Sequence, residues 1–158
     1  MLNRIVLTII FSFALNALAS ASAGEFATPE EARAMLKRAI TEAKANELSA
    51  IERFNHNDVP FRDRDLFVFC FNSDGGKFTA HEAFVARDVR ELRDPNGKPF
   101  GLEMYDKARE DRISEVVYAS QLPGTTELTN KKAYVARIGN QICGVSAYLL
   151  KDSSNPSH

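Results

Sequence analysis

The first apolar pattern in the chain has the period of a helix. Thr28-Pro29-Glu30-Glu31 combines an N-cap residue, a proline at the first helical position and a capping-box glutamate. Apolar residues then recur every three or four positions, with a weaker patch near Asn46. The pattern predicts a long helix over Pro29–Asn55, about 40 Å at 1.5 Å per residue, which can bend near Asn46.

The second pattern is a continuous apolar run, Leu66–Phe71, half of which is aromatic. The run is short for a buried helix and rich in Phe and Val, so it predicts a strand covered on both faces and placed inside a sheet. Asn72–Gly76 follows as a dense turn signal, and Lys77–Ala80 is expected to return as a short strand. The sequence Asp65–His81 therefore predicts a hairpin around which the other elements are arranged.

The rest of the chain alternates between short helical and extended segments. We expect a short helix or ordered loop over His81–Val89, a turn-rich loop over Arg93–Pro99 and a short amphipathic helix over Phe100–Arg109. Three strands are expected to complete the domain: Ile113–Tyr118, Lys132–Ile138 and Gln141–Leu149, with a loop over Gln121–Thr126 and a hairpin turn at Gly139-Asn140.

This order of elements predicts an α+β domain with one antiparallel sheet of five strands. The long helix is expected to cover one face of the sheet. The helical insert between the second and third strands is expected to cover the other face, where a small pocket can form.

The N-terminal end of the chain is mostly apolar and the C-terminal end is polar, and this composition sets both apart from the domain between them. Residues 1–23 contain a single charge at Arg4, a mostly apolar run and the small-x-small sequence Ala21-Ser22-Ala23. They predict a cleaved secretory signal peptide, the alternative being an uncleaved anchor. We therefore expect a domain over 24–150, a flexible polar tail over 151–158 and a periplasmic location, with no membrane span after cleavage.

Charge and motifs exclude several classes of function. Without Arg4, 19 Lys and Arg remain against 21 Asp and Glu, a net charge of −2 with no basic stripe, so we expect no nucleic-acid partner. The three histidines lack metal-ligand spacing, so no metal and no cofactor are expected. The sequence contains no GxSxG, P-loop or GxGxxG motif, and we expect no enzymatic activity.

Two cysteines, Cys70 and Cys143, remain in the expected mature chain. In an exported protein they can pair, while two buried free thiols are the alternative. Cys143 lies in the apolar strand sequence Ile142-Cys143-Gly144-Val145, a setting that raises a thiol pKa and argues against a reactive nucleophile.

Three segments together resemble the single Cache domains, which are PAS-like extracytoplasmic sensing modules of bacteria. They are Asp65–His81, Arg87–Gly101 and Lys131–Leu149, and the likeness extends over roughly residues 28–150 in the same element order. The resemblance implies a PAS-like five-stranded sheet, a long N-terminal helix and a pocket for a small organic acid or amino acid. It also implies that the strands carrying Cys70 and Cys143 are neighbours, so that the two cysteines form a disulfide. One departure is Ala86, where family members often have glycine.

A carboxylate ligand needs cationic or hydrogen-bonding donors in a mostly apolar pocket. The resemblance directs attention to Tyr118, Lys131, Lys132 and Tyr134, with His81 at the end of the second predicted strand. Lys132 and Tyr134 share one face of a strand, and Lys131 joins them only where the strand begins irregularly. The alternative is that the lysines are solvated, Tyr134 belongs to the core and His81 is a surface or satisfied histidine.

The function expected from these observations is small-molecule binding or sensing in the periplasm, by a stand-alone module without its own signalling domain. The rival hypothesis is an accessory domain with an empty or vestigial pocket that binds a membrane receptor or another periplasmic protein.

Overall fold

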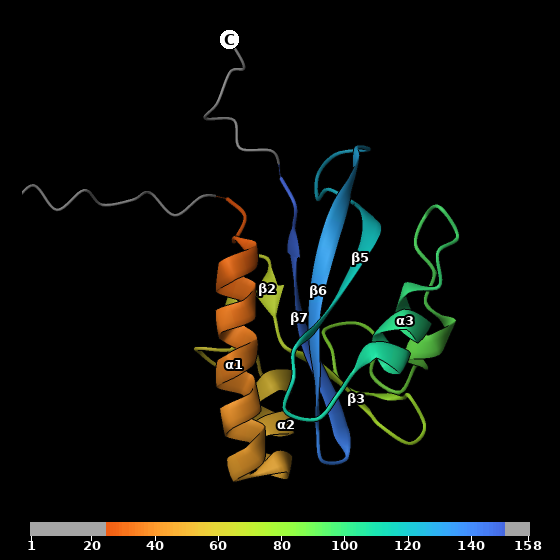
Figure 1. Cartoon of the computed structure of the whole chain (residues 1–158). Helices are drawn as coiled ribbons and strands as arrows, with labels where there is room; N and C mark the ends of the chain where they lie inside the picture. Colours follow the sequence, from red (N-terminus) through yellow and green to blue (C-terminus); the bar gives the residue numbers. More distant parts are fainter. Residues whose placement is uncertain (1–24, 151–158) are drawn as a thin grey trace, which may run out of the picture.

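The computed structural model describes residues 25–150 (Figure 1). The expected signal peptide over 1–23 and polar tail over 151–158 lie outside these residues. Within 25–150, none of the helices combines the length and apolar character that crossing a membrane requires.

The N-terminal helical region begins at the predicted capping box and is divided at Asn46. The Thr28 hydroxyl accepts a hydrogen bond from the Glu31 amide at 3.2 Å, and the Glu31 carboxylate accepts one from the Thr28 amide at 2.7 Å. Helix α1 (Pro29–Ala45) ends at Asn46, where α2 (Glu47–Asn55) starts. The expected bend is thus a complete break, because Asn46 has extended backbone angles and its side chain caps the second helix.

Five strands form one antiparallel sheet in the order β4-β3-β7-β6-β5 (Figure 1). This confirms the predicted α+β class. The observed strands differ from the expected ranges: β5 and β6 extend further toward their connecting loop, β4 and β7 are each one residue shorter, and β3 begins later than expected. The strands are β3 (Phe69–Asn72), β4 (Phe78–Ala80), β5 (Ser114–Gln121), β6 (Leu128–Ile138) and β7 (Gln141–Tyr148).

The apolar run Leu66–Phe71 is not one strand, as the sequence predicts, but two. Its first part, β2 (Leu66–Phe67), pairs with β1 (Arg62–Asp63) in a separate two-stranded sheet. Val68 leaves both ladders, and its amide donates to the Phe61 carbonyl at 3.3 Å. The chain then enters the main sheet as β3, between β4 and β7.

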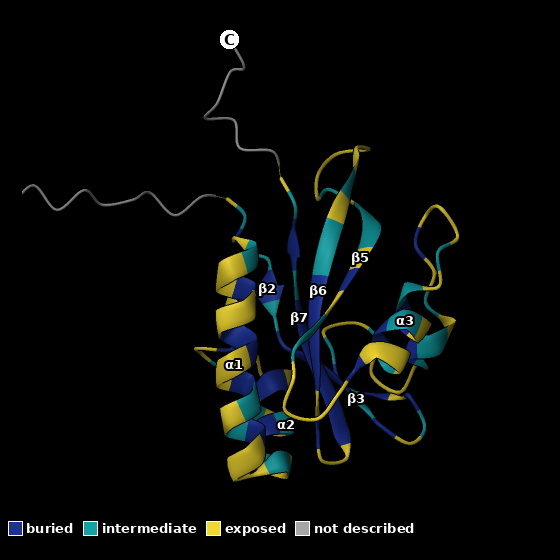
Figure 2. Ribbon diagram, viewed as in Figure 1, coloured by how far each residue is buried: buried dark blue, intermediate teal, exposed yellow. Residues whose placement is uncertain are grey.

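Each face of the sheet is covered by a different part of the chain (Figures 1 and 2). α1 lies over one face, and its outward side is exposed while its inward side is buried. The other face carries the 3₁₀ helix η1 (Val89–Glu91) and α3 (Phe100–Lys107). The expected arrangement of the two layers is therefore confirmed, and each layer has its own apolar core.

The segment between β4 and η1 takes the second of its two predicted forms, an ordered loop made of successive turns. Ala86 lies in these turns with φ of 69°, a backbone conformation that favours glycine. The glycine that the Cache resemblance leads one to expect at this position is thus explained by the backbone.

The two cysteines form a disulfide between neighbouring strands. Cys70 on β3 and Cys143 on β7 are register partners with Cα atoms 4.1 Å apart. Both belong to the core beneath α1, where neither is accessible to solvent. The expected Cys70–Cys143 disulfide is confirmed.

Candidate functional site

A cavity of about 240 Å³ lies between the sheet and the α3 layer. Strand alternation places its side chains, because β3 and β7 turn their odd- and even-numbered residues to opposite layers. Phe69 on β3 faces the cavity while Cys70 faces α1, and Ser146 on β7 faces the cavity while Val145 faces α1. The cavity thus has a floor of sheet residues and a roof from the 81–104 segment.

The wall of the cavity is mainly aromatic. His81 lies inside this wall, stacked on Phe84 at 4.5 Å between ring centres and edge-on to Phe78 at 4.9 Å. On the other side of the cavity Phe100 of α3 stacks on Tyr118 of β5 at 4.2 Å. The apolar lining residues are Phe67, Phe69, Phe78, Phe84, Leu92, Phe100 and Met104, and the polar ones are His81, Tyr118, Ser120, Lys131 and Ser146.

Gly144 on β7 leaves room for the Phe69 ring at the floor of the cavity. A side chain there has no room, since a Cβ atom would lie 2.5 Å from the Phe69 ring and 2.7 Å from the Tyr134 carbonyl oxygen. The absence of that side chain lets the Phe69 ring lie directly on the sheet.

Lys131 is the cation of the cavity. It comes from β6, is partly buried, and its Nζ lies 4.3 Å from the centre of the Tyr148 ring. Among residues 25–150 it has no ion-pair or hydrogen-bond partner. Burial lowers the pKa of Lys131 from its ordinary 10.5, and the charge of Asp65 acts in the opposite direction.

His81 is a neutral donor. Its Nδ1 accepts a hydrogen bond from the Ala83 amide at 3.0 Å, so the proton of the neutral ring is on Nε2. Burial, followed by the charges of Lys131 and Arg87, lowers the pKa of His81 from 6.5 to about 4. At neutral pH the ring can therefore donate through Nε2 without adding charge to the cavity.

Tyr118 supplies a hydroxyl deep in the cavity. It donates to the Ser146 hydroxyl at 3.3 Å. Burial raises the pKa of Tyr118 to about 12, so the phenol stays protonated. Tyr118, Ser146, His81 and Lys131 together form one polar region in an otherwise aromatic cavity.

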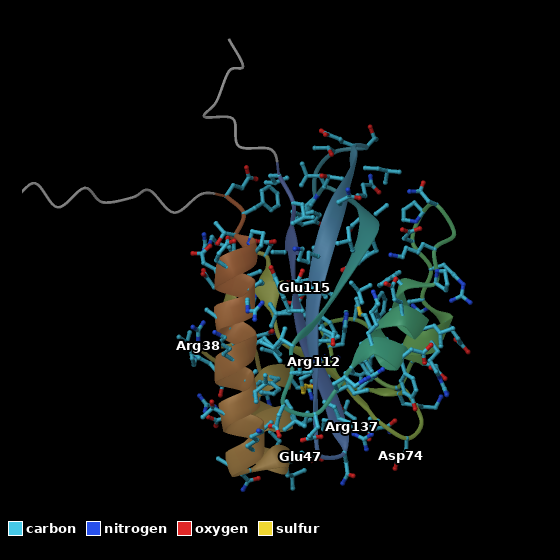
Figure 3. The ribbon with its side chains drawn as sticks, viewed as in Figure 1. Arg38, Glu47, Asp74, Arg112, Glu115 and Arg137 are labelled. Atoms are coloured by element: carbon cyan, nitrogen blue, oxygen red, sulfur yellow. A yellow bond between two sulfur atoms is a disulfide. The ribbon has the colours of Figure 1, made fainter. Side chains whose placement is uncertain are left out.

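The structure brings three of the five candidate residues together and places the other two elsewhere. His81, Tyr118 and Lys131 line the cavity. Lys132 and Tyr134 share a face, as expected, but it is the opposite face: Tyr134 is buried in the core beneath α1. Lys132 pairs there with Glu115 at 2.9 Å. The Glu115 side chain is labelled in Figure 3.

This corrects the expectation that Tyr134 points into the pocket. β6 begins regularly at Leu128, three residues before Lys131, so strict alternation assigns Lys131 to the cavity and Lys132 to the helix side. Sequence reasoning also missed the aromatic wall. The two-residue spacing of Phe67 and Phe69 was the available signal, because residues two apart in extended backbone share a side.

The arrangement suits binding of a small anion and offers no site for a metal. Across residues 25–150, no three His, Cys, Asp or Glu side chains gather as metal ligands would. One ammonium group with hydroxyl and imidazole donors in an aromatic surrounding can hold a carboxylate and enclose a short apolar tail.

No protein-family model matches the chain, and no curated protein matches it. The solved structures that are similar to this chain include the following three. A methyl-accepting chemotaxis protein from Vibrio parahaemolyticus has a TM-score of 0.59 and 18% identity, over 76% of this chain and 87% of that chain. A periplasmic sensor domain of a chemotaxis protein has a TM-score of 0.55 and 20% identity, over 77% and 90% of the two chains.

The third structure is a Cache chemosensory domain described for its recognition of carboxylic acid. Its TM-score is 0.51 and its identity 17%, over 77% of this chain and 88% of that chain. These likenesses show that the chain has the fold of Cache-type sensor domains, as its sequence predicts.

Proposed function

We propose that this chain, with its Cache-type fold, is a periplasmic module that binds a small monocarboxylate. The observation that carries the proposal is Lys131, a partly buried cation in an aromatic cavity that makes no direct ion pair with any carboxylate of residues 25–150. A buried charge is costly unless it is paired, so the cavity is suited to a ligand that brings one negative charge.

The lining favours an anion without an amino group. Among the described residues that line the cavity none is acidic, so an amino-acid ammonium entering it would lose water without gaining a counter-ion. A second carboxylate would similarly lack a cation. The volume of about 240 Å³ is below the range of about 300–1,000 Å³ that drug-sized ligands occupy.

Two further findings support the proposal. The carboxylic acid recognised by the third structural neighbour belongs to the same chemical class, although the low identity transfers only the fold. The apolar, small-residue-ended sequence of 1–23 favours export to the compartment where the second neighbour, a periplasmic sensor domain, is found.

The proposal is tested by calorimetric titration of the domain with propionate, propionamide, alanine and succinate. We expect propionate to bind best, because it alone combines one negative charge with an apolar tail. Lys131→Met should weaken propionate binding by at least about tenfold, since losing the charged partner of a buried group costs about 2–5 kcal/mol.

Lys132→Met is the matched control, because Lys132 lies on the opposite face of the sheet with Glu115. It should leave propionate affinity unchanged. Absence of binding by the wild type, or equal affinities in both lysine variants, would contradict the proposal and favour an accessory domain with a vestigial pocket.

A further inference from the structure

A carboxylate outside the cavity lining, that of Asp65, acts electrostatically on Lys131. Asp65 is in the turn between β1 and β2, and its Oδ1 accepts a hydrogen bond from the Ala27 amide at 2.7 Å. Its Oδ2 is fully buried and has no hydrogen-bond partner within residues 25–150. A buried carboxylate oxygen without a hydrogen-bond partner is costly, and a positive charge nearby offsets that cost.

Lys131 is the cation that can offset this cost. Phe67 lines the cavity together with Lys131, and Asp65 lies two residues before Phe67, in the turn that precedes β2. The charge of Asp65 also acts on Lys131, because it opposes the effect of burial on the pKa of that lysine. Lys131 thus faces the cavity, while the charge of Asp65 acts on it from outside the cavity lining.

A second set of contacts joins Lys131 to the same part of the backbone. The Lys131 ammonium lies 4.3 Å from the centre of the Tyr148 ring, and that ring meets Phe26 edge-on at 5.4 Å. The Tyr148 hydroxyl donates to the Gln121 carbonyl at 3.1 Å, which fixes the ring. Phe26 and Ala27, the two residues before the N-cap of α1, are thus connected to Lys131 by two independent routes.

We propose that Asp65, which forms no direct ion pair with Lys131, is its longer-range counter-charge and couples the charge in the cavity to the anchoring of Phe26 and Ala27 ahead of α1. The link to an occupied cavity rests on the proposed function, whereas the anchoring does not. An anion bound to Lys131 places a second negative charge near Asp65. The Asp65–Lys131 attraction then weakens, and with it the hold of Asp65 on the Ala27 amide. By thermodynamic linkage, the anchoring of Ala27 affects anion binding as much as anion binding affects the anchoring.

The anchoring is tested without any ligand, by NMR-detected hydrogen exchange at the Ala27 amide. Lys131→Met removes both the counter-ion of Asp65 and the cation over Tyr148, and should accelerate this exchange by about tenfold. Lys132→Met, on the other face of the sheet, should leave it unchanged. Equal exchange at Ala27 in the wild type and in Lys131→Met would overturn the anchoring.

The link to occupancy is tested with propionate as the probe. Asp65→Asn keeps an oxygen that can accept from Ala27 but removes the negative charge, so propionate should bind several-fold more tightly. Asp63→Asn, at the end of β1 beside this turn and paired with Arg64, is the control and should not change the affinity. Saturating propionate should accelerate exchange at Ala27 in the wild type.

The outcomes separate the two hypotheses. Propionate that binds the wild type with no effect on Ala27, or that binds Asp65→Asn more weakly, overturns the coupling while leaving the proposed function in place. Preferential binding of alanine that Asp65→Asn abolishes overturns it as well, because Asp65 would then contact the ligand. No binding by the wild type removes the proposed function and the occupancy link together, and the Lys131→Met exchange still decides the anchoring.

Discussion

At the scale of single residues, burial lowers the pKa of both basic groups of the cavity, Lys131 and His81, but from different starting values. Burial lowers the pKa of the Lys131 ammonium from its ordinary 10.5, and the charge of Asp65 opposes this effect. The pKa of His81 falls from 6.5 to about 4, so the ring is neutral. Among the described lining residues the cavity therefore carries one positive charge, which matches one carboxylate.

His81 predicts a dependence of stability on pH. Its folded-state pKa of about 4 is below the ordinary 6.5, so the unfolded chain binds more protons between these values. The free energy of unfolding should therefore be highest above pH 6.5 and decline as the pH falls from 6.5 to about 4. Urea unfolding across this range measures it.

Several carboxylates with lowered pKa values contribute to the same decline, so a comparison of variants isolates His81. His81→Gln should show a shallower pH dependence than the wild type. His56→Gln, which removes an exposed histidine at the end of α2, should follow the wild-type curve. Parallel curves for all three proteins would refute the assignment.

The choice between Lys131 and Lys132 shows where sequence patterns stop being informative. Both faces of the sheet are covered, so residues 133–136 of β6 are buried without alternation. Periodicity could establish that Lys132 and Tyr134 share a face, but it could not say which face meets the cavity. Only the pairing register of β6 with β5 and β7 determines which of its residues face the cavity.

At the scale of elements, Asn46 acts on two helices at once. Its backbone amide donates to the Glu42 carbonyl at the end of α1, and its side-chain oxygen accepts from the Ser49 amide at 3.0 Å at the start of α2. The break lets α2 turn away from the axis of α1 and pack beside β4, where the Asn55 side chain donates to the Thr79 carbonyl at 2.9 Å (Figure 1). One cap thus positions a whole helix.

Replacing this cap should destabilise the protein. Asn46→Ala removes the side-chain acceptor and should lower the free energy of unfolding by about 1 kcal/mol, within a range of about 0.5–2 kcal/mol. Asn46→Asp keeps an acceptor at the N-terminus of α2 and should retain most of the stability. Chemical denaturation followed by circular dichroism compares the three proteins, and a loss of equal size in both variants would argue against the capping role.

The helices were more predictable from the sequence than the strands. The capping box at Thr28 and the weak patch at Asn46 are local signals, and the structure uses both. The division of Leu66–Phe71 into β2 and β3 depends on partners far along the chain, β7 above all, and an unbroken apolar run carries no sign of it.

At the scale of the whole molecule, the sheet joins segments from the two halves of the chain. β3 comes from the first half and β7 is the last strand, yet they are neighbours and carry the disulfide. Residue patterns predicted which helices and strands the chain forms, whereas only the Cache resemblance predicted that β3 and β7 are neighbours. Strand order is a long-range property that local periodicity does not encode.

The disulfide should contribute strongly to stability. Its cysteines are separated by 73 positions. In the chain-entropy model, closing a loop of that length raises the free energy of the unfolded chain by about 4 kcal/mol. The double variant Cys70→Ala/Cys143→Ala should therefore unfold at a lower urea concentration than the wild type. Labelling of the denatured, unreduced wild type should detect no thiols; two labelled thiols per chain would contradict the pairing.

The position of the disulfide also constrains the sequence of events in biogenesis. Both sulfur atoms are shielded beneath α1, on the side of the sheet away from the cavity. An oxidising enzyme cannot reach them once that helix has docked. The bond therefore has to form while the chain is still open, so the compartment in which the protein folds, rather than the one in which it later works, determines whether the bond is present.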